Sequence, residues 1–457
     1  MTTVLQSSAP AEEAWAALGG RSAELERVQL AGDPTGLLPS RLKVHELMSA
    51  AIGSALLAVA VLDAARNDTR LAPVSLPAEH VAVAARSERY ARRTGSDAGA
   101  GMAPLSRFWK ATDGWVRLHA NYPWHLRRAL DVLGCEDDPG QVGQAIAQRT
   151  IADLEDSFAA AGALAFAVRS LDEWTKHPQG QAVASQPLLC TELGPGPRRK
   201  LSPGRALDRI RVLDLTRVIA GPVATRTLAA WGADVLRLDA PQLPEIPAQA
   251  IDTLQGKRSA LLDLSSPHGR QQLDGLLAEA DLLVQGYRPG ALARFGLDTR
   301  ALADRWPHLS VVTLSAWGSS GPWSHRRGFD SLVQCPTGIA AIEGSPSGPG
   351  AMPAQALDHA TGYLAAAAGI MALAASQADG RPRYQRLSLA RTAKWFTDAG
   401  RAQPSHPREP EAGPLLAEVP GPGFTVRVVR PPGQVGDLSP AWTRTTDLGA
   451  DAPSFTA

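Results

Sequence analysis

Apolar and polar positions alternate in blocks from residue 210 onward, and this pattern predicts a parallel sheet. Two short apolar segments, 210–215 and 234–238, flank a helical stretch that opens at Gly221-Pro222 and ends at Gly232. Proline in the first helical turn and glycine just after the last turn are typical of helix boundaries. A strand, a helix and a second strand at this spacing form a βαβ unit, whose strands run parallel.

The same pattern continues along the chain. We expect strands at 259–264, 282–285 and 309–314 and a helix at 267–280. Residues 207–397 are therefore predicted to form a doubly wound, Rossmann-like domain of the α/β class, in which ligands bind at the carboxyl ends of the strands. The first turn, TRVIAGP at 216–222, lacks the GxGxxG pattern of dinucleotide-binding dehydrogenases, which disfavours that class.

The residues before this domain predict a smaller α+β domain. An Ala/Leu/Val-rich helix at 44–65 precedes a glycine-rich stretch at 95–101, and 113–120 alternates as a strand does. Residues 194–200 are rich in proline, glycine and basic side chains, which is typical of a linker. The predicted organisation is a flexible leader (1–20), the smaller α+β segment (21–193), a linker (194–206), the Rossmann-like domain (207–397) and a C-terminal tail (398–457).

Composition narrows the classes of function. The chain has 457 residues, 44% of them apolar, and a formal net charge of +1, so it lacks the basic excess typical of nucleic-acid binders. Its three cysteines are far apart, which predicts neither a disulfide framework nor a metal site. We find no signal-peptide pattern at the start, and the apolar stretches at 50–62 and 364–375 are shorter than a bilayer span. We therefore expect a cytoplasmic protein with no metal, no nucleic-acid partner and no membrane association.

Seven short blocks follow one another over about 150 residues. In this order they resemble the class III CoA-transferases, of the formyl-CoA and carnitine-CoA transferase type. The blocks are VLDLTRVIAGP (212–222), LAAWGADV (228–235), GKRS (256–259), ADLLVQGYRPGAL (280–292), SAWGSSGPW (315–323), GFDSLVQ (328–334) and LDHATG (357–362).

The resemblance implies that Asp358 is the nucleophile. Its carboxylate would attack the thioester carbonyl of an acyl-CoA and form an aspartyl anhydride, then an aspartyl-CoA thioester, before CoA passes to an acceptor acid. The stretch at 95–101 resembles the mobile glycine loop that covers this aspartate, with Gly99 and Gly101 as the candidate positions. A simpler interpretation is that Asp358 only caps the helix that follows it.

The resemblance also implies where CoA binds. CoA and acyl-CoA would be substrates rather than a permanently bound cofactor, the acceptor would be a small carboxylic acid, and the protein would be a homodimer. Guanidinium groups match phosphate geometry, so arginines are candidates for the CoA phosphates. The implied contacts are Val218 and Ala220 along the pantetheine, Leu262 and Tyr287 beside the nucleotide, and Arg288 and Arg294 at the phosphates.

Two other functions stay open. A related branch of the family, the α-methylacyl-CoA racemases, carries a histidine where this chain has Phe329, so a two-base racemisation would lack one base. A non-catalytic CoA-binding partner subunit is the second alternative. It is favoured by departures from the family pattern, because 239–245 lacks the usual Gly-Asp pair and Gly286 replaces a common asparagine.

The halves stand in an unusual order, since the segment that resembles the family's later half comes first. The chain therefore resembles either a circular permutation or two incomplete copies joined together. In an alignment of 51–53 with 360–362, Ser49 falls opposite Asp358, so the first copy would lack the carboxylate.

Overall fold

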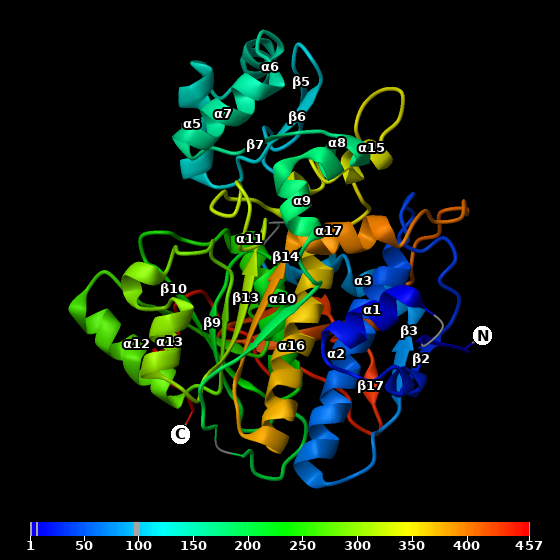
Figure 1. Cartoon of the computed structure of the whole chain (residues 1–457), viewed down its shortest axis with the longest axis vertical. Coiled ribbons are helices and arrows are strands. Elements are labelled where there is room, and N and C mark those ends of the chain that lie inside the picture. Colours follow the sequence, from blue (N-terminus) through cyan, green and yellow to red (C-terminus); the bar gives the residue numbers. More distant parts are fainter. Residues whose placement is uncertain (1, 6–7, 96–100, 199, 457) are drawn as a thin grey trace.

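A seven-stranded sheet forms the centre of the computed structural model, which describes residues 2–5, 8–95, 101–198 and 200–456 (Figure 1). The strand order is β11-β10-β9-β12-β13-β14-β8, parallel except for the edge strand β8. This confirms the α/β class with a Rossmann-like parallel sheet. The strands are β8 (Cys190–Leu193), β9 (Arg211–Leu215), β10 (Asp234–Asp239), β11 (Lys257–Leu261), β12 (Leu282–Gln285), β13 (Ser310–Ser315) and β14 (Arg383–Ser388).

Helices cover both faces of this sheet because successive strand residues point to opposite sides. Val212, Val235 and Val284 face α10 and α16, whereas Leu213, Leu236 and Leu283 face α12 and α13. Figure 1 shows α12 and α13 on the outer face of the sheet and α16 on the inner face. These helices are α10 (Ala220–Ala230), α12 (Pro267–Glu279), α13 (Thr299–Arg305) and α16 (Ala356–Asp379), with α11 (Pro247–Thr253), the 3₁₀ turn η3 (Ala293–Phe295) and α17 (Leu389–Asp398) nearby.

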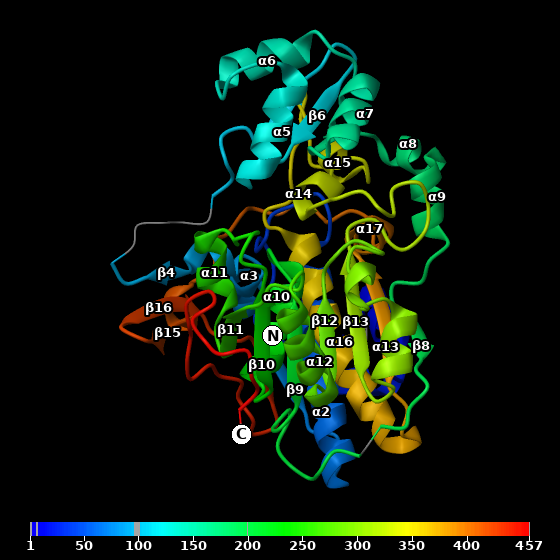
Figure 2. The ribbon, with the colours of Figure 1, turned by 90° about the vertical axis from the view of Figure 1, so that its left-hand side faces the viewer.

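The smaller α+β unit projects from the carboxyl-end side of the sheet, at the top of Figures 1 and 2. Its three-stranded antiparallel sheet and three helices enclose a separate core around Trp109, Leu154 and Phe158. The elements are β5 (Phe108–Lys110), β6 (Trp115–Leu118), β7 (Ala165–Ala167), α5 (Pro123–Leu133), α6 (Pro139–Ala147) and α7 (Ile151–Ala161); α8 (Leu171–Lys176) and α9 (Pro178–Ala184) lead back to the large sheet, and α14 (Asp330–Val333) and α15 (Ile339–Ile342) lie beneath.

The predicted division of the first half is wrong, because residues up to about 90 pack with the Rossmann-like domain. Helix α2 lies along α16, and both contribute to one continuous core. The reason is that α2 is apolar around most of its circumference and needs cover on several sides. The elements here are β1 (Thr2–Val4), α1 (Ala9–Ala17), the 3₁₀ turn η2 (Ser22–Arg27), β2 (Val28–Ala31), α2 (Val44–Asn67), β3 (Val74–Pro77), α3 (Ala78–Ala84), α4 (Ser87–Tyr90) and β4 (Arg92–Arg93).

The segment predicted as a linker is also fixed to the large sheet. Arg198 is buried and donates to the carboxylate of Asp281 at 2.7 Å. Asp281 directly precedes β12, so this ion pair fixes the segment to the sheet. Residues 398–456 are likewise anchored, with Phe455 in the core of the outer face. Their elements are η4 (Gly413–Leu415), β15 (Leu416–Gly421), β16 (Phe424–Val429) and β17 (Gln434–Val435).

Helices α2 and α16 are the centres of two similar units. Each helix has 24 residues, starts after a residue with ψ near 55° (Lys43 and Gln355), and ends at a left-handed residue (Asp68 and Gly380). Each is preceded by a strand and followed by a strand parallel to it, then by a helix: β2-α2-β3-α3 and β13-α16-β14-α17.

The two units exchange their edge strands. β17 from the C-terminal tail pairs antiparallel with β3 of the first unit, and β8, which precedes the second unit, pairs antiparallel with β14 of that unit. Counted from the start of each helix, Glu46 holds the third position of α2 as Asp358 does in α16, whereas the sequence alignment places Ser49 opposite Asp358.

Both long helices also exceed the apolar stretches seen in the sequence. By length and composition each could cross a membrane, contrary to the expectation that they are too short. Their apolar windows are 83% and 89% buried within the fold, as in core helices.

Candidate active site

Asp358 lies in the first turn of α16 and is 5% exposed. It is the third residue of the helix, and the residue before the helix is Gln355, whose side chain makes no capping hydrogen bond. The simpler interpretation of Asp358 as the helix cap is therefore wrong. Its backbone N–H is held by another carboxylate.

Asp330, the first residue of α14, supplies that carboxylate. Its Oδ2 accepts the backbone N–H groups of Leu357 at 2.8 Å and Asp358 at 3.0 Å, and Gln334 donates to its Oδ1 at 2.5 Å. The first N–H groups of a helix have no partner within the helix, and the helix dipole favours a negative charge there. Asp330 thus caps α16 from a distant part of the chain and fixes Asp358.

Two buried carboxyl groups side by side cannot both ionise readily. Burial raises the pKa of Asp358 well above its ordinary value, and the neighbouring charges of Asp330 and Glu88 raise it further. Burial also raises the pKa of Asp330 to about 6, against the lowering effect of the N–H groups that it accepts. The pair therefore holds a proton that a nucleophilic Asp358 must lose.

A third carboxylate approaches from the first unit. Glu88 in α4 lies 2.9 Å from Nε2 of His359, the residue after Asp358. The sequence contains no local signal for this pair, because 271 positions separate its members.

The turn after β9 carries the predicted pantetheine contacts, Val218 and Ala220. Val218 has φ +70°, which is unfavourable for a β-branched residue, and its N–H donates to Oε2 of Glu245 at 3.1 Å. Gly362 of α16 lets this turn come close, since a Cβ at Gly362 would lie 2.5 Å from the carbonyl oxygen of Ala220. The turn and the helix that carries Asp358 are therefore in direct contact.

Glu245 is a site residue that sequence reasoning missed. It lies in 239–245, the stretch noted only for lacking a Gly-Asp pair, and is buried. Arg237 donates to its Oε2 at 3.1 Å, and the hydroxyl of Tyr122 donates to its Oε1 at 2.5 Å. Because Tyr122 belongs to the small unit, Glu245 connects that unit with the strained turn at Val218.

The predicted nucleotide contacts lie along the same edge of the sheet. Leu262 follows β11 directly and Tyr287 follows β12, so both stand with Val218 at carboxyl ends of parallel strands. Burial raises the pKa of Tyr287. Arg294, in η3, has its guanidinium 4.6 Å from the ring centre of Phe295. The structure thus brings Val218, Leu262 and Tyr287 to one edge, where doubly wound sheets bind ligands.

Arg288 lies apart, on the side of the small unit. It lines a pocket of about 90 Å³ together with Arg326 and Arg327, against residues 159–166. Burial lowers the pKa of Arg327, and the charges of Arg288 and Arg128 lower it further, so positive charge is concentrated there.

The glycine positions remain predictions. Gly99 lies outside the described residues, and Gly101 is exposed with open space around its Cα. In the described part of the chain, no group of three or more histidine, cysteine or acidic side chains is arranged to hold a metal ion.

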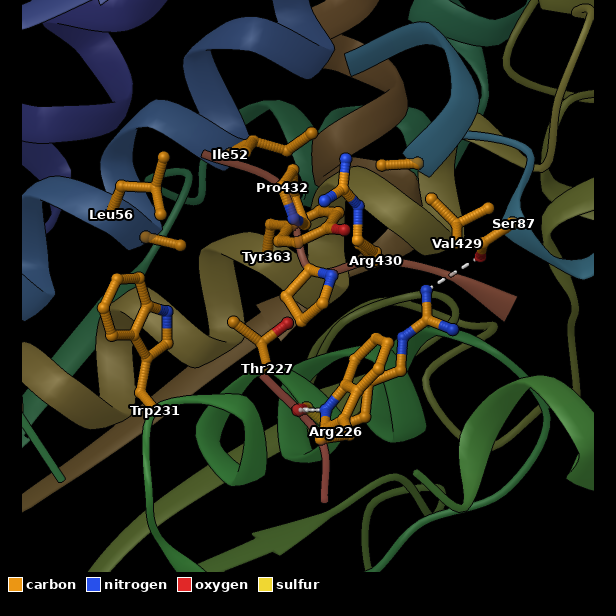
Figure 3. A pocket seen from close by; sticks show the side chains of 14 residues that line it. Ile52, Leu56, Ser87, Arg226, Thr227, Trp231, Tyr363, Val429, Arg430 and Pro432 are labelled. Carbon is orange, nitrogen blue, oxygen red and sulfur yellow. Dashed lines mark hydrogen bonds between the residues drawn. The ribbon is translucent and has the colours of Figure 1, made fainter. Parts of the chain in front are cut away.

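A small cavity of about 20 Å³ lies between α2, α16, α10 and the tail (Figure 3). It has room for about one water molecule. Tyr363, Thr227 and Pro432 line it, and Arg226 points from its wall to Ser87. This cavity is a packing gap between the two units and too small for a substrate.

Aromatic rings fill the boundary between the small unit and α14. The ring of His119 stacks on Phe329 with centres 4.1 Å apart, and Tyr122 stacks on Trp124 at 4.7 Å. Burial lowers the pKa of His119 to about 3, so this imidazole is neutral. Sequence reasoning singled out Phe329 but gave no signal for its partners.

Comparison with known proteins finds relatives of the central part of the chain. Residues 207–412 match the model of CoA-transferase family III. The chain is 30% identical over 246 residues to the probable fatty acyl-CoA transferase Rv3272 of Mycobacterium tuberculosis, a match that covers 50% of this chain and 62% of that protein. It is 33% identical over 201 residues to a formyl-CoA:oxalate CoA-transferase of Rhodopseudomonas palustris, over 41% of this chain and 46% of that one.

A crystal structure of Rv3272 aligns with 41% of this chain and 55% of its own, at 31% identity and a TM-score of 0.39. The chain therefore spans less than two thirds of the length of these relatives. The resemblance expected from the sequence blocks is confirmed for the matched segment.

Proposed function

Residues 207–412 match the model of CoA-transferase family III, and from this similarity we propose that the chain transfers CoA from an acyl-CoA donor to a small carboxylic acid. The observation that supports this most is the position of Asp358. It stands in the first turn of α16, held through its N–H by Asp330 and beside the turn that follows β9. CoA itself is a substrate in this proposal.

In the proposed reaction, the deprotonated carboxylate of Asp358 attacks the thioester carbonyl. The C–S bond breaks, CoA leaves as a thiolate, and an aspartyl anhydride forms. The thiolate then attacks the aspartyl carbonyl, which releases the donor acid and leaves an aspartyl-CoA thioester. An acceptor carboxylate reverses the two steps and carries CoA away. Covalent catalysis of this kind divides one difficult exchange into easier steps.

The environment of Asp358 suits these steps. Its burial limits access of water, which would hydrolyse the anhydride and lose the energy of the thioester. Its raised pKa makes the carboxylate, once formed, more basic and more nucleophilic than an exposed one. We propose that Val218 and Ala220 flank the pantetheine, and that Leu262, Tyr287 and Arg294 contact the nucleotide.

Racemisation is a weaker alternative. The imidazole nearest to Phe329 is His119, and a general base works best when its pKa is near the operating pH. With a pKa of about 3, His119 is too weak a base for that role.

The test is intact-protein mass spectrometry after mixing with a panel of acyl-CoAs, on wild type and Asp358→Asn. We expect a CoA or acyl adduct that hydroxylamine removes, on the wild type only. Tight CoA binding with neither adduct nor exchange would instead favour a non-catalytic CoA-binding subunit. Exchange of the α-proton without an adduct would favour a racemase.

A further inference from the structure

Glu88 is the buried charge beside Asp358 that the proposed reaction does not use. It comes from α4 of the first unit and reaches His359 in the second unit. The side chain of Glu88 is 12% exposed and that of His359 is 0% exposed. A hydrogen bond between such buried groups fixes both side chains, because neither has water as an alternative partner.

The tautomer of His359 follows from its two nitrogens. Nε2 lies 2.9 Å from Glu88, whereas Nδ1 is buried and has no hydrogen-bond partner in the described part of the chain. A carboxylate can only accept, so Nε2 is the ring nitrogen that donates to Glu88. Burial alone would raise the pKa of Glu88, but the hydrogen bond and charge of His359 lower it below its ordinary value, so Glu88 is ionised.

The charges around Glu88 do not cancel it. Arg226 of α10 is engaged with Asp252 of α11 at 2.7 Å, and it also donates to Ser87 at 2.8 Å (Figure 3). Arg89, the next residue in α4, turns toward the carbonyl oxygen of Pro353 at 2.5 Å. The titratable and charged groups that act on this corner are Asp330 of α14, Glu88 and Arg89 of α4, Arg226 of α10, Asp252 of α11, and His359 and Asp358 of α16.

We propose that Glu88 is a positioning residue for Asp358, which it serves by anchoring the first turn of α16 through His359 and by placing a negative charge beside the nucleophile. The proposal rests on the proposed role of Asp358. It makes the first unit, which lies outside the segment that matches the family, a part of the working site.

The test compares Glu88→Gln with Glu88→Ala. Glutamine can still accept the hydrogen bond of His359 but carries no charge, whereas alanine removes both. Glu46→Gln is the control for loss of a carboxylate outside the site, because Glu46 lies in the first turn of α2 and is engaged with Ser8 and Lys43. Two pH profiles are measured: the rate of acyl or CoA adduct formation, and the labelling of Asp358 by a carbodiimide, located by peptide mass spectrometry, which needs no acyl-CoA.

We expect Glu88→Gln to move the midpoint of both profiles to lower pH by roughly half a unit or more, since a like charge has been removed. Its rate at optimal pH should stay within a few-fold of wild type, while Glu88→Ala should lose roughly tenfold or more. Unchanged midpoints in Glu88→Gln would overturn the proposal, and so would a wild-type rate in a folded Glu88→Ala. A shifted carbodiimide midpoint without any adduct in wild type would refute the proposed transferase function but keep the role of Glu88.

The exchanged strands carry a second inference. Each unit receives its edge strand from the segment that follows the other unit along the chain. β17, after the second unit, pairs with β3 of the first, and β8, after the first unit, pairs with β14 of the second. In a pair of separate chains, such an exchange would tie two subunits together. Here both halves are in one chain.

The first unit does not repeat the site. Its sheet, in the part that the structure describes, consists of β1, β2, β3 and β17, without counterparts of β9 to β12 that carry the predicted CoA contacts. The carboxylate at the equivalent helical position, Glu46, accepts a hydrogen bond from Ser8 at 3.0 Å and lies 3.5 Å from Lys43. It is engaged on the surface rather than buried beside a second carboxyl group.

We infer that a single chain is a fused pair of units with one working site, so that the homodimer expected from the resemblance is not required. Light scattering after size exclusion should give a monomer, with one adduct per chain at completion and an activity per chain that does not fall on dilution. A dimer whose activity falls on dilution would overturn this inference, as would two adducts per chain.

Discussion

Replacing Asp330 by asparagine should change how stability depends on pH. The pKa of this carboxyl rises from an ordinary 3.8 to about 6 in the folded protein, so the folded state binds a proton more tightly than the unfolded state. A raised carboxyl pKa gives stability that is present below the unfolded pKa and is lost as pH rises through the folded pKa. The window is therefore about pH 4 to pH 6.

The magnitude follows from the two pKa values. Their difference, 3.8 to about 6, is about two units, and one unit corresponds to 1.36 kcal/mol, so the pH-dependent part is about 3 kcal/mol. Asparagine keeps an oxygen that can accept the N–H groups of Leu357 and Asp358 but does not ionise. Relative to wild type, Asp330→Asn should thus gain about 3 kcal/mol between pH 4 and pH 7, which for a chain of this length is about 3 °C in the midpoint of thermal unfolding.

The assay is thermal unfolding of wild type and Asp330→Asn between pH 4 and pH 8, with Asp358→Asn measured in parallel because the two carboxyl groups titrate as a pair. Asp330→Ala, which cannot accept the helix N–H groups, serves as the comparison for lost capping and should be less stable than Asp330→Asn by about 1–3 kcal/mol at every pH. If the difference between wild type and Asp330→Asn is the same at pH 4 and pH 7, Asp330 does not titrate in this window and the reasoning is refuted.

Three further changes test other parts of the site. Lys257→Met should cost about 3–5 kcal/mol, because it leaves the buried carboxylate of Asp214 without its cation at 3.0 Å, and the double variant with Asp214→Asn should recover most of that in denaturant unfolding. Gly362→Ala should destabilise the fold by about 1–3 kcal/mol, since the new Cβ pushes on the turn after β9. It should also weaken CoA binding, measured by calorimetry. Unchanged binding would show that this turn does not contact CoA. Tyr122→Phe removes the hydrogen bond to Glu245, so hydrogen exchange in residues 105–165 should quicken while the large sheet stays protected; equal protection in both would show that this bond does not hold the small unit.

Local patterns in the sequence were sufficient for five of the seven strands of the large sheet, β9 to β13, but not for β8 and β14. The strand predicted at 282–285 is β12 itself, and those predicted at 210–215, 234–238 and 309–314 match β9, β10 and β13 to within one residue at either end. A buried parallel strand is a short apolar run between turn residues, and that signal lies within a few neighbouring positions. The family blocks succeeded for the same reason, because each lies in one turn or one strand end.

The sequence alone could not assign the first 90 residues or the partners of Asp358. Helix α2 is apolar on most sides, which predicts burial but not the helix against which it packs. Asp330, Glu88 and Glu245 act across separations of 27 to 271 positions, and nothing local marks a carboxylate that caps a distant helix or pairs with a distant histidine.

The division has one physical cause. Strands, helices and turns are selected by side chains that are neighbours along the chain, so the sequence by itself determined five of the seven strands of the Rossmann-like sheet. The proton held by the Asp358 and Asp330 pair, the charge of Glu88 and the exchange of edge strands depend on which surfaces bury one another. Burial changes the free energy of a charge only after packing has removed the water around it, and only the tertiary structure decided where that happens.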